Sequence, residues 1–162
     1  MSTAWLGLGS NINAEAHIRA GIREIEEKFE KVCLSPTYAS TSVGFEGDDF
    51  INLVARVETD LHPIELRRYL RDLEDRYGRK RNVPKFSDRS LDVDVLIYDD
   101  LVVFSPVLEI PRAEIMKFAH VLKPLAELNP DLVHPVERRC MAEIWESSGL
   151  DDGYLRLLTS FP

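Results

Sequence analysis

The stretch DRSLDVDVLIYDD, residues 88–100, decides the fold because its apolar residues alternate as they do in a buried strand. Val93 and Val95 stand two positions apart, and successive side chains of a strand point to opposite faces of the sheet. Asp92 and Asp94 therefore lie side by side on the other face. Two carboxylates at that spacing lie roughly 6–7 Å apart and repel each other. Some other interaction must therefore offset the repulsion between these two carboxylates on one strand face.

The segments on either side of this strand predict an α+β fold. Apolar residues recur at every second position in some segments and at every third or fourth position in others. The resulting order of strand, helix, strand, strand, helix, strand is that of the ferredoxin-like βαββαβ core, with a mainly antiparallel sheet and helices packed on it. A C-terminal hairpin, two short helices and a last helix are expected after this core. The expected bounds are 3–9, 31–40, 50–59 and 90–98 for strands, and 14–29, 63–77 and 141–148 for helices.

The length and composition are typical of one globular domain. The 162 residues are 44% hydrophobic and 30% charged, and residues 1–162 are expected to form a single domain with its own core. No apolar run approaches the roughly 20 residues that span a membrane, and the N-terminus has no signal-peptide pattern. Cys33 and Cys140 show no metal-ligand spacing. We therefore expect a cytoplasmic protein with two reduced thiols, and a monomer is favoured.

The distribution of charge points to a small anionic ligand. A formal net charge of −8 gives no electrostatic reason to bind nucleic acid or an anionic membrane. The segment RKRNVPKFSDR, residues 79–89, nevertheless carries five cations against one carboxylate. A basic run is often only a solvated loop. Because this one leads directly to Asp92 and Asp94, we interpret it as a site for one small, highly charged anion.

Paired carboxylates beside arginines suit a metal-bound polyphosphate. Mg²⁺ typically takes one or two carboxylates and completes its shell with water and substrate phosphates. Two such ions about 3.5–4 Å apart fit carboxylates at this separation. The alternative is that Asp92 and Asp94 are two solvated residues on an ordinary strand face.

Other motifs are weaker. GLGSNI, residues 7–12, has Ile12 where a dinucleotide-binding fingerprint needs its third glycine. The chain has no P-loop motif, and its four histidines show no zinc-binding spacing. We expect most of these histidines at the surface or at helix caps.

Five stretches of the chain carry a family resemblance. They are LGSN (8–11), FIN (50–52), LEDRYGRKR (73–81), DRSLDVDVLIYDD (88–100) and IPRAEIMKFAHVLKPLAELNPDLVHP (110–135). In this order, and over nearly the whole chain, they resemble the 6-hydroxymethyl-7,8-dihydropterin pyrophosphokinases of folate biosynthesis. The resemblance implies an enzyme that uses ATP and two Mg²⁺ ions. Such an enzyme transfers the β,γ-diphosphoryl group of ATP to the hydroxymethyl group of the pterin and releases AMP.

The resemblance also implies roles for individual residues. Asp92 and Asp94 match the metal-binding aspartates and, with Arg79 and Arg89, form the catalytic set. The implied ATP-binding residues are Glu74, Arg79, Arg81, Arg89 and Arg112. The implied pterin-binding residues are Ser40, Thr41, Ser42, Val43, Phe50, Asn52, Phe86 and His120.

The chain departs from the family pattern at several of these positions. Arg112 follows Pro111 where the family usually has histidine, and Phe118 stands where it usually has arginine. His120 replaces the second stacking aromatic residue, which is normally phenylalanine. The nucleotide half of the site is thus retained better than the pterin half. Two alternatives remain open: a related pyrophosphokinase acting on a differently substituted pterin, or a non-catalytic nucleotide-binding relative.

Overall fold

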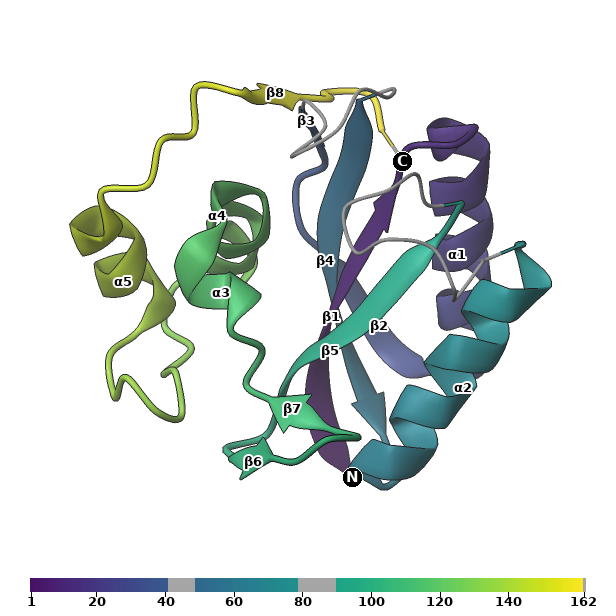
Figure 1. The fold of residues 1–162 in the computed structure, drawn as a ribbon, viewed down its shortest axis with the longest axis horizontal. Coiled ribbons are helices and arrows are strands. Elements are labelled where there is room, and N and C mark those ends of the chain that lie inside the picture. Colours follow the sequence, from purple (N-terminus) through teal and green to yellow (C-terminus); the bar gives the residue numbers. More distant parts are fainter. Residues whose placement is uncertain (41–48, 79–89, 162) are drawn as a thin grey trace.

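In the part of the chain that the structure describes, a sheet of six strands runs through the centre of the fold, with helices on both of its faces (Figure 1). The structure is a computed structural model and describes residues 1–40, 49–78 and 90–161. Neighbouring strands of the main sheet follow the order β5-β1-β4-β3-β8, and β2 also pairs with β4. Every pairing is antiparallel. The strands are β1 (Ser2–Ser10), β2 (Glu30–Leu34), β3 (Tyr38–Ser40), β4 (Phe50–Thr59), β5 (Asp92–Tyr98) and β8 (Leu155–Leu157).

The helices and the hairpin complete the α+β fold that the sequence predicts. α1 and α2 cover one face of the sheet, and α3, α4 and α5 lie on the other side (Figure 1). β6 and β7 form a separate two-stranded sheet. The bounds are α1 (Ala14–Lys28), α2 (Pro63–Arg76), α3 (Glu114–Lys117), α4 (Ala119–Leu128), α5 (Met141–Ser148), β6 (Val103–Phe104) and β7 (Glu109–Ile110).

The strand expected at 31–40 is in fact two strands, which corrects the prediction. Leu34 lies opposite Ala55 and Tyr38 lies opposite Asn52, so this side of the ladder has one more residue than β4. Pro36 cannot donate a ladder hydrogen bond. Ser35 replaces the lost pairing, because its hydroxyl accepts from Val54 N at 2.8 Å and its own N–H donates to Val54 O at 2.8 Å.

Local sequence explains why α2 begins and ends where it does. His62 caps its start, with Nδ1 accepting from Ile64 N, and Pro63 occupies the first turn. Leu66, Leu70 and Leu73 form the buried stripe of the helix. Gly78 follows its end with φ +85°, a left-handed conformation that glycine adopts without strain.

Two apolar clusters, one on each face of the sheet, hold the layers together. Leu6 and Leu53 point to the cluster under α1 and α2, whereas Trp5 and Val54 point to the cluster under α4 and α5. Adjacent residues of β1 and β4 thus face opposite ways, as the strand period requires. Within the described ranges, no helix combines the length and apolar character that crossing a membrane requires.

Candidate functional site

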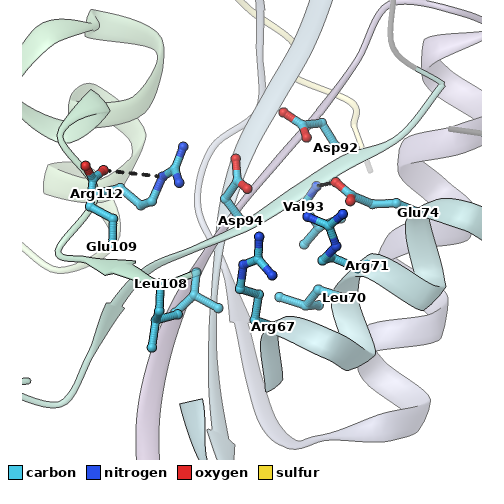
Figure 2. Close-up of a pocket in the computed structure, with 11 residues that line it drawn as sticks. Arg67, Leu70, Arg71, Glu74, Asp92, Val93, Asp94, Leu108, Glu109 and Arg112 are labelled. Atoms are coloured by element: carbon cyan, nitrogen blue, oxygen red, sulfur yellow. Dashed lines mark hydrogen bonds and ion pairs between the residues drawn. The ribbon is translucent and has the colours of Figure 1, made fainter. Parts of the chain in front are cut away.

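A polar pocket opens where the edge strand β5 meets α2 and the end of the β6–β7 hairpin (Figure 2). β5 contributes two aspartates, α2 contributes two arginines and a glutamate, and the residues around β7 contribute a further glutamate and arginine. The pocket is lined by Arg67, Leu70, Arg71, Glu74, Asp92, Val93, Asp94, Val95, Leu108, Glu109 and Arg112.

Asp92 and Asp94 lie on one face of β5, as the alternation predicts. Val93 is 3% exposed and Val95 is 6% exposed, and both belong to the cluster beneath α1 and α2. The two aspartates between and before them are only partly buried, and Figure 2 shows both carboxylates at the pocket. The alternation in the sequence thus puts both carboxylates on one face of β5, and the fold brings that face to the pocket.

Glu74 lies beside these aspartates but is itself buried, with 3% of its surface exposed. Its Oε2 accepts a 2.8 Å hydrogen bond from the backbone N–H of Val93. β5 is an edge strand of the sheet, so Glu74 satisfies a backbone donor in place of a neighbouring strand. Glu74, which is predicted to bind ATP, therefore also holds in place the strand that carries Asp92 and Asp94.

Arg67 and Arg71 line the same pocket, and the sequence interpretation did not single them out. They stand four residues apart on α2, next to the buried stripe of Leu66 and Leu70. Residues at that spacing share one helix face. Glu74 continues the row three residues after Arg71. The signal that could have found them was an arginine pair on the helix face that borders the leucine stripe.

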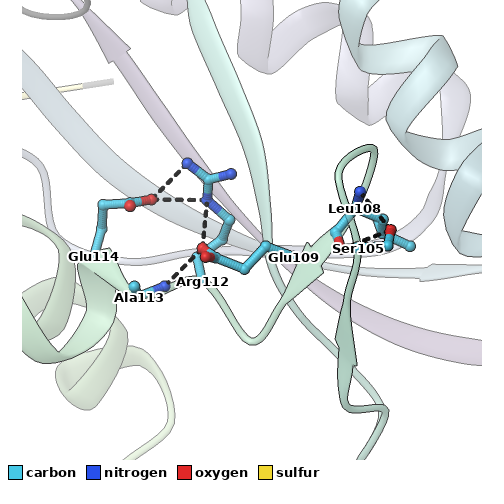
Figure 3. A network of polar contacts seen from close by, with 6 residues as sticks. All are labelled: Ser105, Leu108, Glu109, Arg112, Ala113 and Glu114. Atoms are coloured by element: carbon cyan, nitrogen blue, oxygen red, sulfur yellow. Dashed lines mark hydrogen bonds and ion pairs between the residues drawn. The ribbon is translucent and has the colours of Figure 1, made fainter.

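Arg112 reaches the pocket from the other side and is held by carboxylates (Figures 2 and 3). Its Nε and Nη2 each lie 2.7 Å from Glu114 Oε2, and its Nε lies 4.0 Å from Glu109 Oε2. Glu109 Oε2 also accepts from Ala113 N at 3.1 Å. Burial opposes the charged form, but Asp94 and the two glutamates outweigh it and raise the pKa of Arg112. Arg112 is therefore a permanent cation facing Asp94.

The donors in this pocket fit a magnesium ion that arrives with phosphates. Asp92 and Asp94 supply two carboxylates, as many as Mg²⁺ usually takes from protein. Among the residues that the structure describes, no group of three or more histidines, cysteines or acidic residues forms a complete metal cage. Phosphate oxygens and water would have to complete the shell, and Arg67, Arg71 and Arg112 lie around the same pocket to balance their charge.

Asn52 and Ser40, two of the predicted pterin-binding residues, contact each other near the start of β4, where Asn52 and Asp92 lie on either side of Gly9 of β1. Asn52 Nδ2 donates to Ser40 Oγ at 3.0 Å, and Ser40 lies opposite Phe50 in the β3–β4 ladder. Gly9 on β1 leaves the room for Asn52, because a Cβ there would lie 2.9 Å from Asn52 Oδ1. The structure thus brings Ser40, Phe50 and Asn52 together.

His120, the remaining described member of this set, lies at the start of α4. Its ring stacks on Phe118, with centroids 5.2 Å apart and planes at 18°. Its Nδ1 lies 3.0 Å from the hydroxyl oxygen of Tyr154. Burial lowers the pKa of His120 to about 4, so the ring is neutral at physiological pH. His134 is the exception among the histidines, most of which were expected at surface or cap positions, because it is 3% exposed.

The structure therefore brings together Glu74, Asp92, Asp94 and Arg112 in one pocket. Seven predicted site residues lie outside the described ranges: Thr41, Ser42, Val43, Arg79, Arg81, Phe86 and Arg89.

Comparison with known proteins matches residues 5–130 to the family model of 7,8-dihydro-6-hydroxymethylpterin-pyrophosphokinase. A 2-amino-4-hydroxy-6-hydroxymethyldihydropteridine pyrophosphokinase of Aquifex aeolicus is 34% identical over 145 residues, covering 88% of this chain and 90% of its own length. The folic acid synthesis protein fol1 of Schizosaccharomyces pombe is 32% identical over 162 residues. That match covers 98% of this chain but only 22% of the yeast protein.

Among solved structures, the fold resembles that of the wild-type HPPK-DHPS of Plasmodium falciparum crystallised with SDX-DHP. The TM-score is 0.70 at 14% sequence identity, and the match covers 90% of this chain and 43% of that one. At this identity the likeness concerns the fold alone. The chain thus spans less than half of the Plasmodium protein, but nearly the full length of the Aquifex relative.

Proposed function

The chain belongs to the 7,8-dihydro-6-hydroxymethylpterin-pyrophosphokinase family, and on this premise we propose its reaction and the residues that carry it. The protein is an ATP-dependent pyrophosphokinase of folate biosynthesis. It transfers the β,γ-diphosphoryl group of ATP to the hydroxymethyl group of 6-hydroxymethyl-7,8-dihydropterin. Residues 1–162 act as a single pyrophosphokinase domain.

The observation that carries the site assignment is the meeting of two carboxylates with three arginines in one pocket. Asp92 and Asp94 would hold up to two Mg²⁺ ions, and these ions, when bound, would neutralise charge on the phosphate oxygens. Arg67 and Arg71 bind the polyphosphate from α2, and Arg112 binds it from the hairpin side. Arg79, Arg81 and Arg89 remain predicted ATP contacts, the first and last of them predicted catalytic residues.

Transfer of the diphosphoryl group depends mainly on positioning the two substrates and neutralising the charge of the phosphates. The substrate hydroxyl oxygen attacks the β-phosphorus, the bond from that phosphorus to the oxygen bridging it to the α-phosphorus breaks, and AMP leaves. The hydroxyl proton is released to solvent or phosphate. Arginines fixed around the triphosphate bind it in the geometry that an in-line displacement requires. Glu74 keeps β5, and with it Asp92 and Asp94, in place through Val93 N.

The pterin binds near the start of β4, at the end of the sheet where Asn52 and Asp92 both lie opposite Gly9 of β1. Asn52 hydrogen-bonds the ring, with its amide oriented by Ser40. Phe50 and His120 stack on the ring from either side. Thr41, Ser42, Val43 and Phe86 are further predicted contacts. A second candidate, the same reaction on a differently substituted pterin, is favoured by one observation: the stacking residue is a histidine already engaged by Phe118 and Tyr154.

The test is AMP formation from ATP with and without Mg²⁺, using a series of 6-substituted dihydropterins. Mg²⁺-dependent AMP and a diphosphorylated product with the hydroxymethyl compound support the proposed reaction. Faster turnover of another 6-substituted pterin would favour the second candidate. ATP binding without AMP from any member of the series would identify a non-catalytic relative.

A further inference from the structure

The chain after α5 returns to the sheet and presents Tyr154 to α4. Lys123 Nζ on α4 forms a 2.8 Å ion pair with Asp152 Oδ2, and Leu155 N donates to Asp152 O at 3.0 Å. Leu155 begins β8 and lies opposite Ser40 of β3. Tyr154 is therefore held between an ion pair and a strand pairing, at the same end of the sheet as Ser40.

One oxygen atom of Tyr154 makes two contacts with His120. The backbone N–H of His120 donates to the hydroxyl oxygen at 3.2 Å, and His120 Nδ1 lies 3.0 Å from the same oxygen. Because a backbone N–H can only donate, the hydroxyl accepts there, and its own hydrogen is left for another acceptor. Within the described part of the chain, Nδ1 is the acceptor within hydrogen-bonding distance. Accepting at Nδ1 places the proton of a neutral imidazole on Nε2.

Phe118 and Tyr154 together leave one face and one edge of the imidazole for a ligand. Phe118 stacks nearly parallel on the ring at 5.2 Å, so one face is covered. The Tyr154 ring meets the imidazole edge-on, at 6.1 Å and 82°, and its hydroxyl occupies Nδ1. The second face and the Nε2–H donor are the parts of the ring that these two neighbours do not use.

We propose that Tyr154 is a positioning residue for the pterin. It holds the His120 ring in the form with the proton on Nε2, and the second face of that ring stacks on a flat heteroaromatic substrate. Nε2–H then donates to a hydrogen-bond acceptor on that substrate. This inference rests on the proposed function, since it takes the pterin as the stacking ring. A phenylalanine at position 120 would offer the face without the donor. The Tyr154–His120 pair therefore selects for a substrate with an acceptor at its edge.

The test combines a spectrum with a double-mutant cycle. Long-range proton–nitrogen NMR of the full chain reports which nitrogen of His120 carries the proton, and needs no substrate. Steady-state kinetics of wild type, Tyr154→Phe, His120→Phe and the double variant then measure KM for the pterin and for ATP. Tyr98→Phe is the matched control, because Tyr98 Oη donates to Leu61 O at 2.6 Å, far along the chain from His120.

The expected result is the Nε2–H form in the wild type, and a pterin KM raised about fivefold in Tyr154→Phe, the size of one ordinary hydrogen bond. KM for ATP stays unchanged, Tyr98→Phe leaves both constants unchanged, and Tyr154→Phe has no further effect in the His120→Phe background. A wild-type proton on Nδ1, or an equal effect of Tyr154→Phe in both backgrounds, would overturn the inference.

Failure of the proposed function gives a different result. If the wild type forms no AMP from ATP and the hydroxymethyl-dihydropterin, the proposed function fails, and the substrate part of this inference fails with it. The NMR spectrum then decides the hydrogen-bond arrangement alone. If the wild type turns over normally and only the Tyr154 effect is absent, this inference fails while the function stands.

Discussion

The buried carboxylate of Glu74 accepts a 2.8 Å hydrogen bond from the backbone N–H of Val93, the residue between Asp92 and Asp94 in β5. One hydrogen bond thus joins α2 to the strand that carries both pocket aspartates. We predict that Glu74→Ala lowers the free energy of unfolding by about 2–3 kcal/mol, because a buried donor loses a charged acceptor. Chemical denaturation measures this. Glu74→Gln keeps an acceptor oxygen and should lose less, and exposed Asp72→Ala on the same helix is the control.

If Glu74 acts only by holding β5, the Gln variant should also retain most of its turnover. A Gln variant as stable as the wild type but inactive would instead mean that the charge of Glu74 acts on the nucleotide directly.

Loss of one pocket aspartate should remove activity without unfolding the protein. We predict that Asp94→Asn lowers kcat by roughly 100-fold or more and raises the Mg²⁺ concentration needed for half-maximal rate. Its melting temperature should change little, because the lost attraction between Asp94 and Arg112 is offset by the lost repulsion between Asp94 and Asp92. Asp100→Asn, in the exposed turn after β5, is the matched control. Unchanged Mg²⁺ dependence in Asp94→Asn would refute the metal assignment.

The arginines of α2 offer a test of the phosphate site. We predict that Arg71→Ala raises KM for ATP about tenfold or more, which corresponds to the loss of one charged hydrogen bond. KM for the pterin should not change. Arg68 lies on the exposed side of the same helix, so Arg68→Ala supplies the control. Equal behaviour of the two variants would show that the position of Arg71 at the pocket has no part in ATP binding.

His134 makes the stability of the C-terminal region depend on pH. Its Nδ1 accepts from Val136 N at 3.1 Å and Glu137 N at 3.0 Å, which a protonated ring cannot do. Burial lowers the pKa of His134, against a weaker opposite effect of the Glu137 charge. The unfolded chain therefore binds this proton first on acidification, so stability is complete above pH about 6.5 and falls below it.

Denaturation at a series of pH values measures this effect. His134→Asn keeps an acceptor that does not titrate, so its stability should fall less as the pH drops below about 6.5. His120, whose pKa is lowered to about 4, contributes with the same sign as the pH falls from about 6.5 to 4. An identical pH profile for the wild type and His134→Asn would contradict the assignment to His134.

The local patterns were sufficient to predict much of the fold. Alternation in residues 90–98 predicted β5 and the shared face of Asp92 and Asp94, and Pro63 with the leucine stripe predicted α2. These features depend on residues two to four positions apart, which the backbone itself brings together. The prediction of one strand over 31–40 was wrong because the ladder is interrupted at Ser35 and Pro36. This interruption depends on the pairing with β4, which the local pattern does not contain.

Within one strand or helix, therefore, the sequence by itself determined which residues share a face. Only the tertiary structure decided which faces meet: Arg67 and Arg71 with Asp94, Glu74 with Val93, and Tyr154 with His120, 34 residues away. The physical reason is range. Side-chain periodicity follows from backbone geometry at short separation, whereas a pocket or a hydrogen bond between distant elements depends on sheet order and helix packing, which no local spacing records.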